Sequence, residues 1–318
     1  MAAVLPAAKR ADIGSQRLAF VLMLAFFVLG PLGMYPVFLM KVMCFALFAC
    51  AFNLLIGFGG LLSFGHAMFL GTAGYAAAHS AKIWGFPPEL AVVFGTACAF
   101  LLSIVSGLLA IRRLGIYFSM ITLALAQMVF FFYLQMPFTG GEDGIQAVPR
   151  GRLFGFIDLS NIWAMYYTVF AVFLGGFLLI HRVIHSPFGQ VLKSIRENEA
   201  RATSLGYDSV RYKFMAFVLS GTLAGVAGAV KALVFQLASL TDVHWTMSGE
   251  VVLMTLLGGL GTIFGPVVGA FIIIAMENYL AQLGAWVTVV QGAIFVVCVL
   301  TFRRGVVGEI AHFIKKPL

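Results

Sequence analysis

Six histidines and four cysteines are the side chains of this sequence best suited to hold a metal or to act as nucleophiles. The histidines fall in separate segments, and the cysteines lie in apolar runs without the close spacing of metal ligands. The sequence also has no phosphate-binding loop, zinc-protease helix or serine nucleophile turn. We therefore expect no enzyme: no catalytic residues, no metal site and no cofactor bound by this chain. If ATP drives the protein, another chain must bind it.

The densest run of charge lies in residues 193–213, which read KSIRENEARATSLGYDSVRYK. A short helix over 188–206 would combine an apolar stripe with a charged rim, the pattern of a surface that docks on a soluble protein. Gly189 and Gly206 bracket this helix as hinge or cap positions. A merely solvated loop would not need the stripe. The stripe comprises Val191, Leu192, Ile195, Ala202 and Leu205, and the polar rim comprises Lys193, Arg196, Glu197, Asn198, Glu199 and Arg201.

The rest of the chain is apolar to a degree that is typical of membrane proteins. Hydrophobic residues make up 62% and charged residues 10% of the 318 residues. Lipid offers the backbone no hydrogen-bond partners, and the apolar runs are of helix length with Gly and Ala scattered through them. The sequence therefore predicts an all-α, polytopic transmembrane bundle with about eight full spans. The helices are expected near 17–35, 37–57, 62–82, 89–110, 114–136, 162–184, 212–238 and 285–302, with a broken pair across 249–281.

The distribution of Lys and Arg predicts the orientation of these helices. Most of the 20 basic residues fall in segments 1–17, 111–113, 182–213 and 303–318, which share one side if the N-terminus is cytoplasmic. We therefore expect a cytoplasmic segment 1–17, a transmembrane domain 18–302 that includes a cytoplasmic loop at 185–210, and a cytoplasmic tail 303–318. The net charge of +8 then reflects contact with anionic headgroups, and no nucleic acid partner is needed.

Residues 249–281 must enter and leave the membrane from the same side in this topology. About 30 residues are too few for two spans of ~20 residues each. The stretch LLGGLGTIFGPVVGA (256–270) therefore predicts two short helices that meet partway across, with Gly258, Gly259, Gly261 and Thr262 at the reversal. Such backbone needs protein or water around it, so we expect it to line the solute pathway. A loose glycine hinge between packed helices is the alternative.

Mild polar residues inside the predicted helices are further candidates for a pathway. Asn53, Ser63, His66 and Gln127 either bond between helices or line the route of a small polar solute around the glycine break at 57–60. Lys231 has no acidic partner at helical spacing, and we expect it to extend toward the outer interface. A stand-alone secondary carrier would normally show intramembrane acids or an internal repeat, so it is the weaker alternative.

The longest predicted external loop reads TGGEDGIQAVPRGRLFG (139–155). Gly140, Gly141 and Gly144 supply turn geometry, while Glu142 and Asp143 supply negative charge. We expect this loop to contact a second protein or to close the external gate, against the alternative of a plain connecting loop.

Four stretches of the sequence resemble permease subunits of branched-chain amino acid ABC importers, the LivH/LivM family and in particular its LivM type. The third stretch is the most specific, because it resembles the cytoplasmic coupling segment of those permeases. The stretches are NLLIGFGGLLSFGHAMFLGTAGY (53–75), TGGEDGI (139–145), SPFGQVLKSIRENEARATSLGYDSVRYKFMAFVLSGTLAGVAGAV (186–230) and GGLGTIFGPVVGA (258–270).

The resemblance implies a set of partners. In such importers a short cytoplasmic helix of each permease rests in a cleft of an ATPase subunit. The resemblance therefore implies two ATPase subunits that bind ATP, a second LivH-like permease, an extracytoplasmic solute-binding protein and the bacterial inner membrane. The residues it implies for ATPase coupling are Gly189, Leu192, Ile195, Arg196, Glu197, Asn198, Glu199, Arg201, Ala202 and Gly206.

The transported solute is the least determined property. Branched-chain amino acids are what the resemblance implies first, but similar permeases carry urea, short-chain amides or aromatic acids. The sequence does not separate these solutes, because specificity in such importers resides largely in the binding protein.

Overall fold

The computed structural model describes residues 11–113, 115–280, 284, 286–301 and 305–314. Parts of the two expected cytoplasmic ends lie outside the described residues, namely 1–10, 303, 304 and 315–318.

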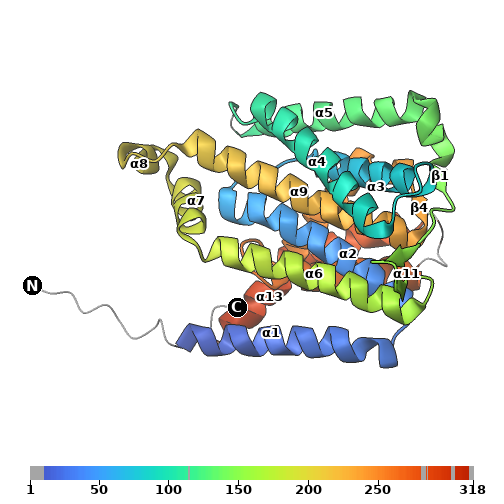
Figure 1. Cartoon of the computed structure of the whole chain (residues 1–318). Helices are drawn as coiled ribbons and strands as arrows, with labels where there is room; N and C mark the ends of the chain where they lie inside the picture. The colour runs from blue at the N-terminus through green and yellow to red at the C-terminus, as the bar shows by residue number, and fades with distance from the viewer. Residues whose placement is uncertain (1–10, 114, 281–283, 285, 302–304, 315–318) are drawn as a thin grey trace, which may run out of the picture.

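Helices dominate the described residues, which confirms the all-α prediction (Figure 1). The strands are two-residue antiparallel pairs, in which Ile145 lies opposite Ala238 and Arg152 opposite Asp158. The helices are α1 (Ala11–Leu29), α2 (Pro36–Asn53), α3 (His66–Lys82), α4 (Pro88–Ala110), α5 (Ile116–Gln135), α6 (Ile162–Ile184), α7 (Pro187–Glu197), α8 (Glu199–Ser204), α9 (Ser209–Phe235), α10 (Trp245–Gly258), α11 (Gly265–Leu280), α12 (Trp286–Thr301) and α13 (Gly305–Ile314). The strands are β1 (Ile145–Gln146), β2 (Arg152–Leu153), β3 (Ile157–Asp158) and β4 (Leu237–Ala238).

In the part of the chain that the structure describes, five helices are long and apolar enough to cross a membrane. They are α2 with its continuation to Phe58, α4, α5, α6 and α9. Helices α1 and α11 are apolar but shorter. These helices establish a polytopic membrane protein, while the number of about eight full spans stays a prediction.

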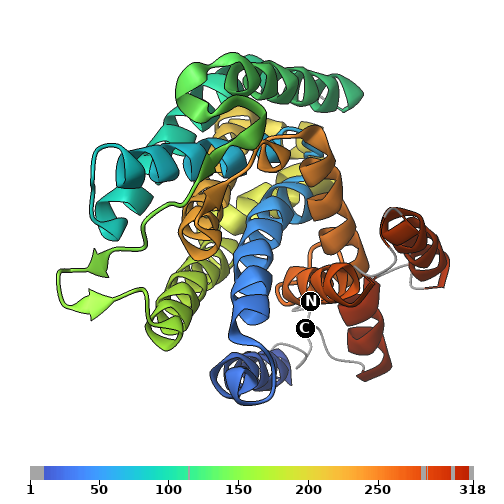
Figure 2. The same cartoon turned by 90° about the vertical axis from the view of Figure 1, so that its right-hand side faces the viewer.

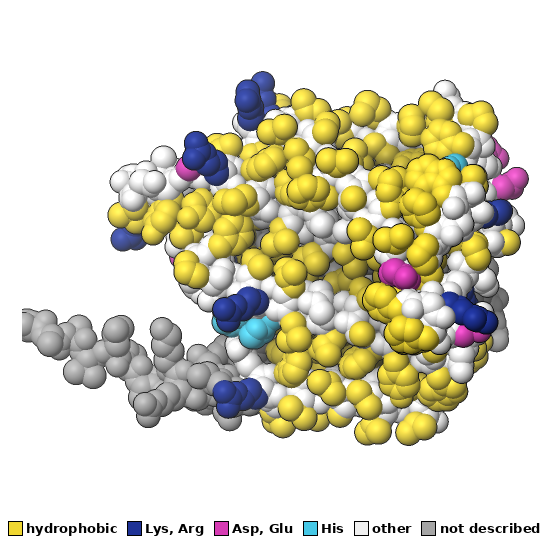
Figure 3. Space-filling model, in the orientation of Figure 1, with side chains coloured by type: hydrophobic (Ala, Val, Ile, Leu, Met, Phe, Trp, Pro, Cys, Tyr) yellow, Lys and Arg dark blue, Asp and Glu magenta, His cyan; other side chains and the backbone are white. Residues whose placement is uncertain are grey.

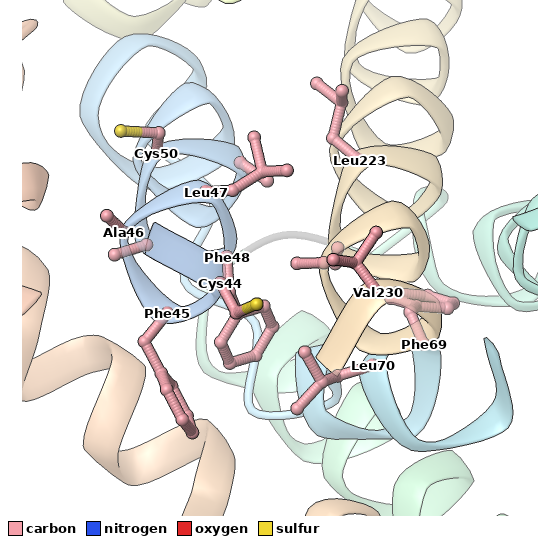
Figure 4. Close-up of a cluster of buried hydrophobic side chains, with 14 of the residues drawn as sticks. Cys44, Phe45, Ala46, Leu47, Phe48, Cys50, Phe69, Leu70, Leu223 and Val230 are labelled. Carbon is pink, nitrogen blue, oxygen red and sulfur yellow. The ribbon is translucent and has the colours of Figure 1, made fainter. Parts of the chain in front are cut away.

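Helix α2 lies at the centre of the bundle. Pro36 begins it, at a position where a backbone N–H would have no partner within the helix. Nearly every later residue of the helix is buried. It packs against α6, α9 and α11. Figure 4 shows Leu47 of α2 and Leu223 of α9 in the space between the two helices, with Leu70 of α3 nearby. A helix that is apolar all round is expected in this position, because it is covered on every side.

Glycines let α3, α4 and α9 approach one another closely. A side chain at Gly228 of α9 would come within 1.9 Å of the Leu70 carbonyl oxygen of α3, and one at Gly225 within 2.4 Å of Ala99 of α4. Close backbone contact replaces hydrophobic burial as a source of attraction between helices in lipid. The AGVAGAV stretch (224–230) therefore serves as the packing face of α9.

The two ends of the bundle differ. Helices α7 and α8 project at the left end of Figure 1, and the strands β1 and β4 lie at the right end, which Figure 2 views directly. Arg112 and Arg113, which follow α4, and Arg182, near the end of α6, lie at the α7 end. The basic segments 111–113 and 182–213 therefore share one end, as the positive-inside argument requires.

Candidate functional site

Helix α7 is held against the bundle by its own apolar residues. Ser186 caps its first turn and Pro187 begins it, while Leu192 and Ile195 are 0% and 2% exposed. Gly189 lies inside the first turn, where a side chain would come within 2.3 Å of the Ile184 carbonyl oxygen. Gly189 is therefore required by the close passage of α7 over the end of α6, and its assignment as a hinge or cap is wrong.

The segment 188–206 forms two helices, so the prediction of one continuous helix is wrong. Helix α7 ends at Glu197, and Asn198 adopts an extended conformation and caps α8 by accepting a bond from the Arg201 N–H at 3.0 Å. An extended cap residue cannot continue the preceding helix. Gly206, with φ of +91°, follows α8 and donates to the Thr203 carbonyl at 2.9 Å, as expected for a residue that ends a helix.

The apolar stripe is largely occupied by the chain itself. Leu192, Ile195 and Ala202 are buried, whereas Leu205 is 71% exposed. The stripe is therefore not free for a partner, contrary to the sequence argument. The surface left open to a soluble protein includes the polar residues Glu197, Asn198 and Arg201 together with the exposed apolar side chain of Leu205.

Glu199 ties α8 to the start of α9. Its carboxylate lies 2.6 Å from the Lys213 Nζ, and the Lys213 side chain is 6% exposed. Burial raises the pKa of Glu199, but hydrogen bonds from Lys213 and Ser209 and the charge of Lys213 outweigh burial and hold the pKa below its ordinary value of 4.5. Glu199 therefore belongs to an internal contact, so it is not a free rim charge.

Arg196 reaches from α7 to the break after α2. A five-residue π-helical turn, Leu54–Phe58, follows α2, and Arg196 donates a hydrogen bond to the Gly57 carbonyl within it. Gly60 has φ of +70°, and a side chain there would lie 2.8 Å from Arg196 Cγ. Helix α7 therefore packs against the glycine break predicted at 57–60.

Asn53 clasps the reversal between α10 and α11. Its Nδ2 donates to the Thr262 carbonyl oxygen at 2.8 Å, and its Oδ1 accepts from the Gly261 N–H at 3.1 Å. Asn53 is 2% exposed, so no solvent competes for these two bonds. We call this pair of bonds the Asn53 clasp. It fixes the last residue of α2 to a segment more than 200 positions away.

The reversal itself depends on glycine. Gly259 and Gly261 have φ of +124° and +74°, a region that residues with a Cβ avoid. A side chain at Gly258 would come within 2.0 Å of the Gly265 carbonyl oxygen. Thr262 is half-buried and donates to the Gly259 carbonyl at 2.7 Å, which closes the turn.

This reversal lies beside α7 and joins two helices of 14 and 16 residues, each shorter than a full span of ~20 residues; its depth in the membrane stays a prediction. A side chain at Gly261 would approach the Arg196 guanidinium at 3.4 Å. Two groups of residues that the sequence kept apart, the coupling residue Arg196 and the pathway residues Asn53, Gly261 and Thr262, therefore form one site.

The other predicted pathway residues lie elsewhere. His66 bonds Ser220 at 2.8 Å and packs edge-on against Phe52 at 4.9 Å, deep between α2, α3 and α9. Ser63 is fully buried, and its hydroxyl accepts from the Gly65 N–H at 3.2 Å. Gln127 is half-buried on α5 and takes no part in the Asn53 clasp. His66 thus joins α3 to α9, while Ser63 makes a local bond in the loop before α3.

The sequence did not reveal two ion pairs that involve residues of the bundle helices. Lys41 of α2 lies 3.0 Å from Glu277 of α11, and Lys231 of α9 pairs with the buried Asp242. Lys231 therefore has an acidic partner in the segment that follows α9, while its expected extension toward the outer interface stays a prediction. No helical spacing links Lys41 to Glu277, which are 236 residues apart, so no pattern in the sequence indicated the pair.

At the opposite end, the glycines of the external loop form tight turns as expected. Gly140, Gly141 and Gly144 all have positive φ, and a side chain at Gly144 would come within 2.2 Å of the Ala238 carbonyl. Asp143 is exposed between them. The β1–β4 pairing holds this loop against the end of α9.

Residues 35–299 match the family model described as the branched-chain amino acid transport system / permease component. The chain belongs to this family. The LivM permease of the high-affinity branched-chain amino acid transport system of Salmonella typhimurium is 25% identical over 83% of this chain and 67% of its own length. The ribose import permease RbsC of Bacillus subtilis is 28% identical over 90% of both chains. A probable branched-chain amino acid permease LivH of Methanocaldococcus jannaschii is 28% identical over 40% of this chain.

The chain is thus an ABC-type permease component embedded in a membrane, and the proteins it resembles are transporters. Membership of this family implies association with ATPase subunits.

Proposed function

We propose that this permease forms half of the membrane pathway of an ATP-driven importer of branched-chain amino acids. A second, LivH-like permease would form the other half, two ATPase subunits would bind the ATP, and an extracytoplasmic solute-binding protein would deliver the solute. The family match and the likeness to LivM support this proposal. In this arrangement the permease lies in a bacterial inner membrane with both chain ends in the cytoplasm, so that α7 faces the ATPase.

The observation that carries the mechanism is the contact of Arg196 with the Gly57 carbonyl, next to the Asn53 clasp. An ATPase that docks on the exposed residues Glu197, Arg201 and Leu205 would move α7 when it closes. Arg196 and Leu192 would pass this motion to the π-helical turn, and the Asn53 clasp would pass it to the reversal at 259–264. Leu192 and Asn53 are buried and have few alternative positions, and the exposed Arg196 is held by its bond to the Gly57 carbonyl, so a displacement of α7 is transmitted through them.

The solute is proposed from the LivM likeness, and the likeness to a ribose permease makes a sugar the competing candidate. Uptake into proteoliposomes that contain both permeases, the ATPases and external binding protein tests the proposal. We expect ATP-dependent uptake of leucine, isoleucine and valine. Uptake of ribose or urea in their place would overturn the solute assignment, and uptake by this chain without any ATPase would overturn the whole mechanism.

A further inference from the structure

A groove between α1 and α6 combines a basic mouth with apolar walls. It encloses about 580 Å³, within the range of roughly 300–1,000 Å³ that is usual for ligand sites. Gln16, Arg17, His181 and His185 supply its polar lining. Among the described residues that line it none is acidic, so the groove has a single sign of charge.

The two histidines form an ordered pair at the mouth. His181 lies in the last turn of α6 and His185 directly follows the helix, and their rings lie with centroids 4.3 Å apart at a tilt of 35°. The His185 ring bonds the His181 carbonyl at 2.8 Å, which fixes its orientation. Arg182, which lies between them in the sequence, is exposed. In Figure 3 the cyan side chains lie between two dark blue groups at the left end of the yellow surface.

Below the mouth the groove is apolar. Phe20, Leu178 and Phe264 line it, and Phe177 links two of them through ring contacts at 6.2 Å to Phe20 and 5.5 Å to Phe264. Helix α6 is one of the five helices able to span a membrane, so these walls continue into its lipid-facing surface. A ligand that fills both parts needs an anionic head and a long apolar tail.

We propose that this groove binds one anionic phospholipid through its phosphate headgroup. Basic pockets between transmembrane helices recognise such headgroups, and here Arg17 provides the positive charge while the two histidine rings offer N–H donors to the phosphate. The N-terminal residues of this chain are a poor alternative occupant, because Lys9 and Arg10 carry the same charge as the groove. The lipid tail would contact Phe264, which belongs to the reversal held by the Asn53 clasp.

Native mass spectrometry of the purified chain with phosphatidylglycerol and with phosphatidylcholine of the same acyl chains tests this site. We expect the unmodified chain to retain phosphatidylglycerol preferentially. Arg17→Gln should reduce this preference about fivefold. One basic group near an anionic membrane surface contributes ~1 kcal/mol to binding, which corresponds to that factor. Arg112→Gln is the matched control, because Arg112 is an exposed arginine at the same end of the bundle and is not among the groove residues.

Leu178→Trp fills the groove while leaving its charges in place, and we expect it to remove the bound lipid of either kind. The proposal is wrong if the unmodified chain shows no preference, a result that does not depend on any variant folding. It is also wrong if Arg112→Gln loses as much preference as Arg17→Gln, or if glycerol phosphate at equal concentration displaces the lipid, which would indicate a site for soluble phosphate.

Discussion

Replacing Asn53 with alanine tests whether the clasp joins α2 to the reversal. The substitution removes both bonds and leaves the partly buried Gly261 N–H and Thr262 carbonyl without their partner. Each buried polar group left unpaired costs about 1–3 kcal/mol. One kcal/mol shifts the melting temperature of a domain of 150–250 residues by about 2–4 °C, and less in a longer chain. We therefore expect the melting temperature to fall by roughly 4–10 °C.

The assay is thermal unfolding of the purified permease in detergent, followed by ATP-dependent uptake in the reconstituted complex. Gln127→Ala is the matched control, since it deletes a half-buried amide that takes no part in the clasp. We expect this control to melt close to the unmodified chain. We also expect Asn53→Ala to lower uptake while the ATPases still associate, because their docking surface is unchanged.

If Asn53→Ala melts together with the Gln127→Ala control and transports normally, the clasp contributes nothing and the proposed route from α7 to the reversal is refuted. A fall in stability with normal uptake would confine Asn53 to a packing role.

Four further outcomes are expected. Gly261→Val should abolish uptake in a complex that still assembles, because a β-branched residue resists φ of +74°, whereas Gly249→Val, with open space around its Cα, should transport normally. Glu197→Lys should weaken ATPase pull-down without changing the melting temperature, since this exposed charge affects docking more than folding. Glu199→Gln should destabilise the protein at neutral pH, and its deficit should shrink as pH falls below 4.5, because the lowered pKa of Glu199 stabilises the fold only while the carboxylate is ionised. A cysteine at the exposed Asp143 should cross-link to the solute-binding protein, and no product across several linker lengths would argue against contact there.

The elements that could be predicted from sequence are those set by local pattern. The apolar run of α2 and the glycines of the external loop each determine a structure within a few residues, so both agree with expectation. The glycine-rich stretch at 256–270 likewise predicted a reversal, because a tight turn needs glycine at positions within the turn itself.

The errors concern contacts between segments that are distant in sequence. The stripe of Leu192 and Ile195 indicated an amphipathic helix, but periodicity does not say whether the chain or a partner covers it. The sequence also did not indicate that Asn53 binds the reversal or that Lys231 pairs with Asp242. Neither partner lies at a spacing that a single sequence reveals.

Helix α9 gives the molecule a rigid connection between its two ends. Its 27 residues, Ser209–Phe235, extend about 40 Å without a break. Lys213 near its start is bound to Glu199, and its end leads into the β4 strand that pairs with the external loop. A protein that binds the loop and a protein that binds α8 therefore act on the same element. Binding free energies that are coupled through one element are reciprocal. Suppose that a partner bound to the external loop changes the affinity of this permease for the ATPase by some factor. Binding of the ATPase must then change the affinity of the loop for its partner by the same factor.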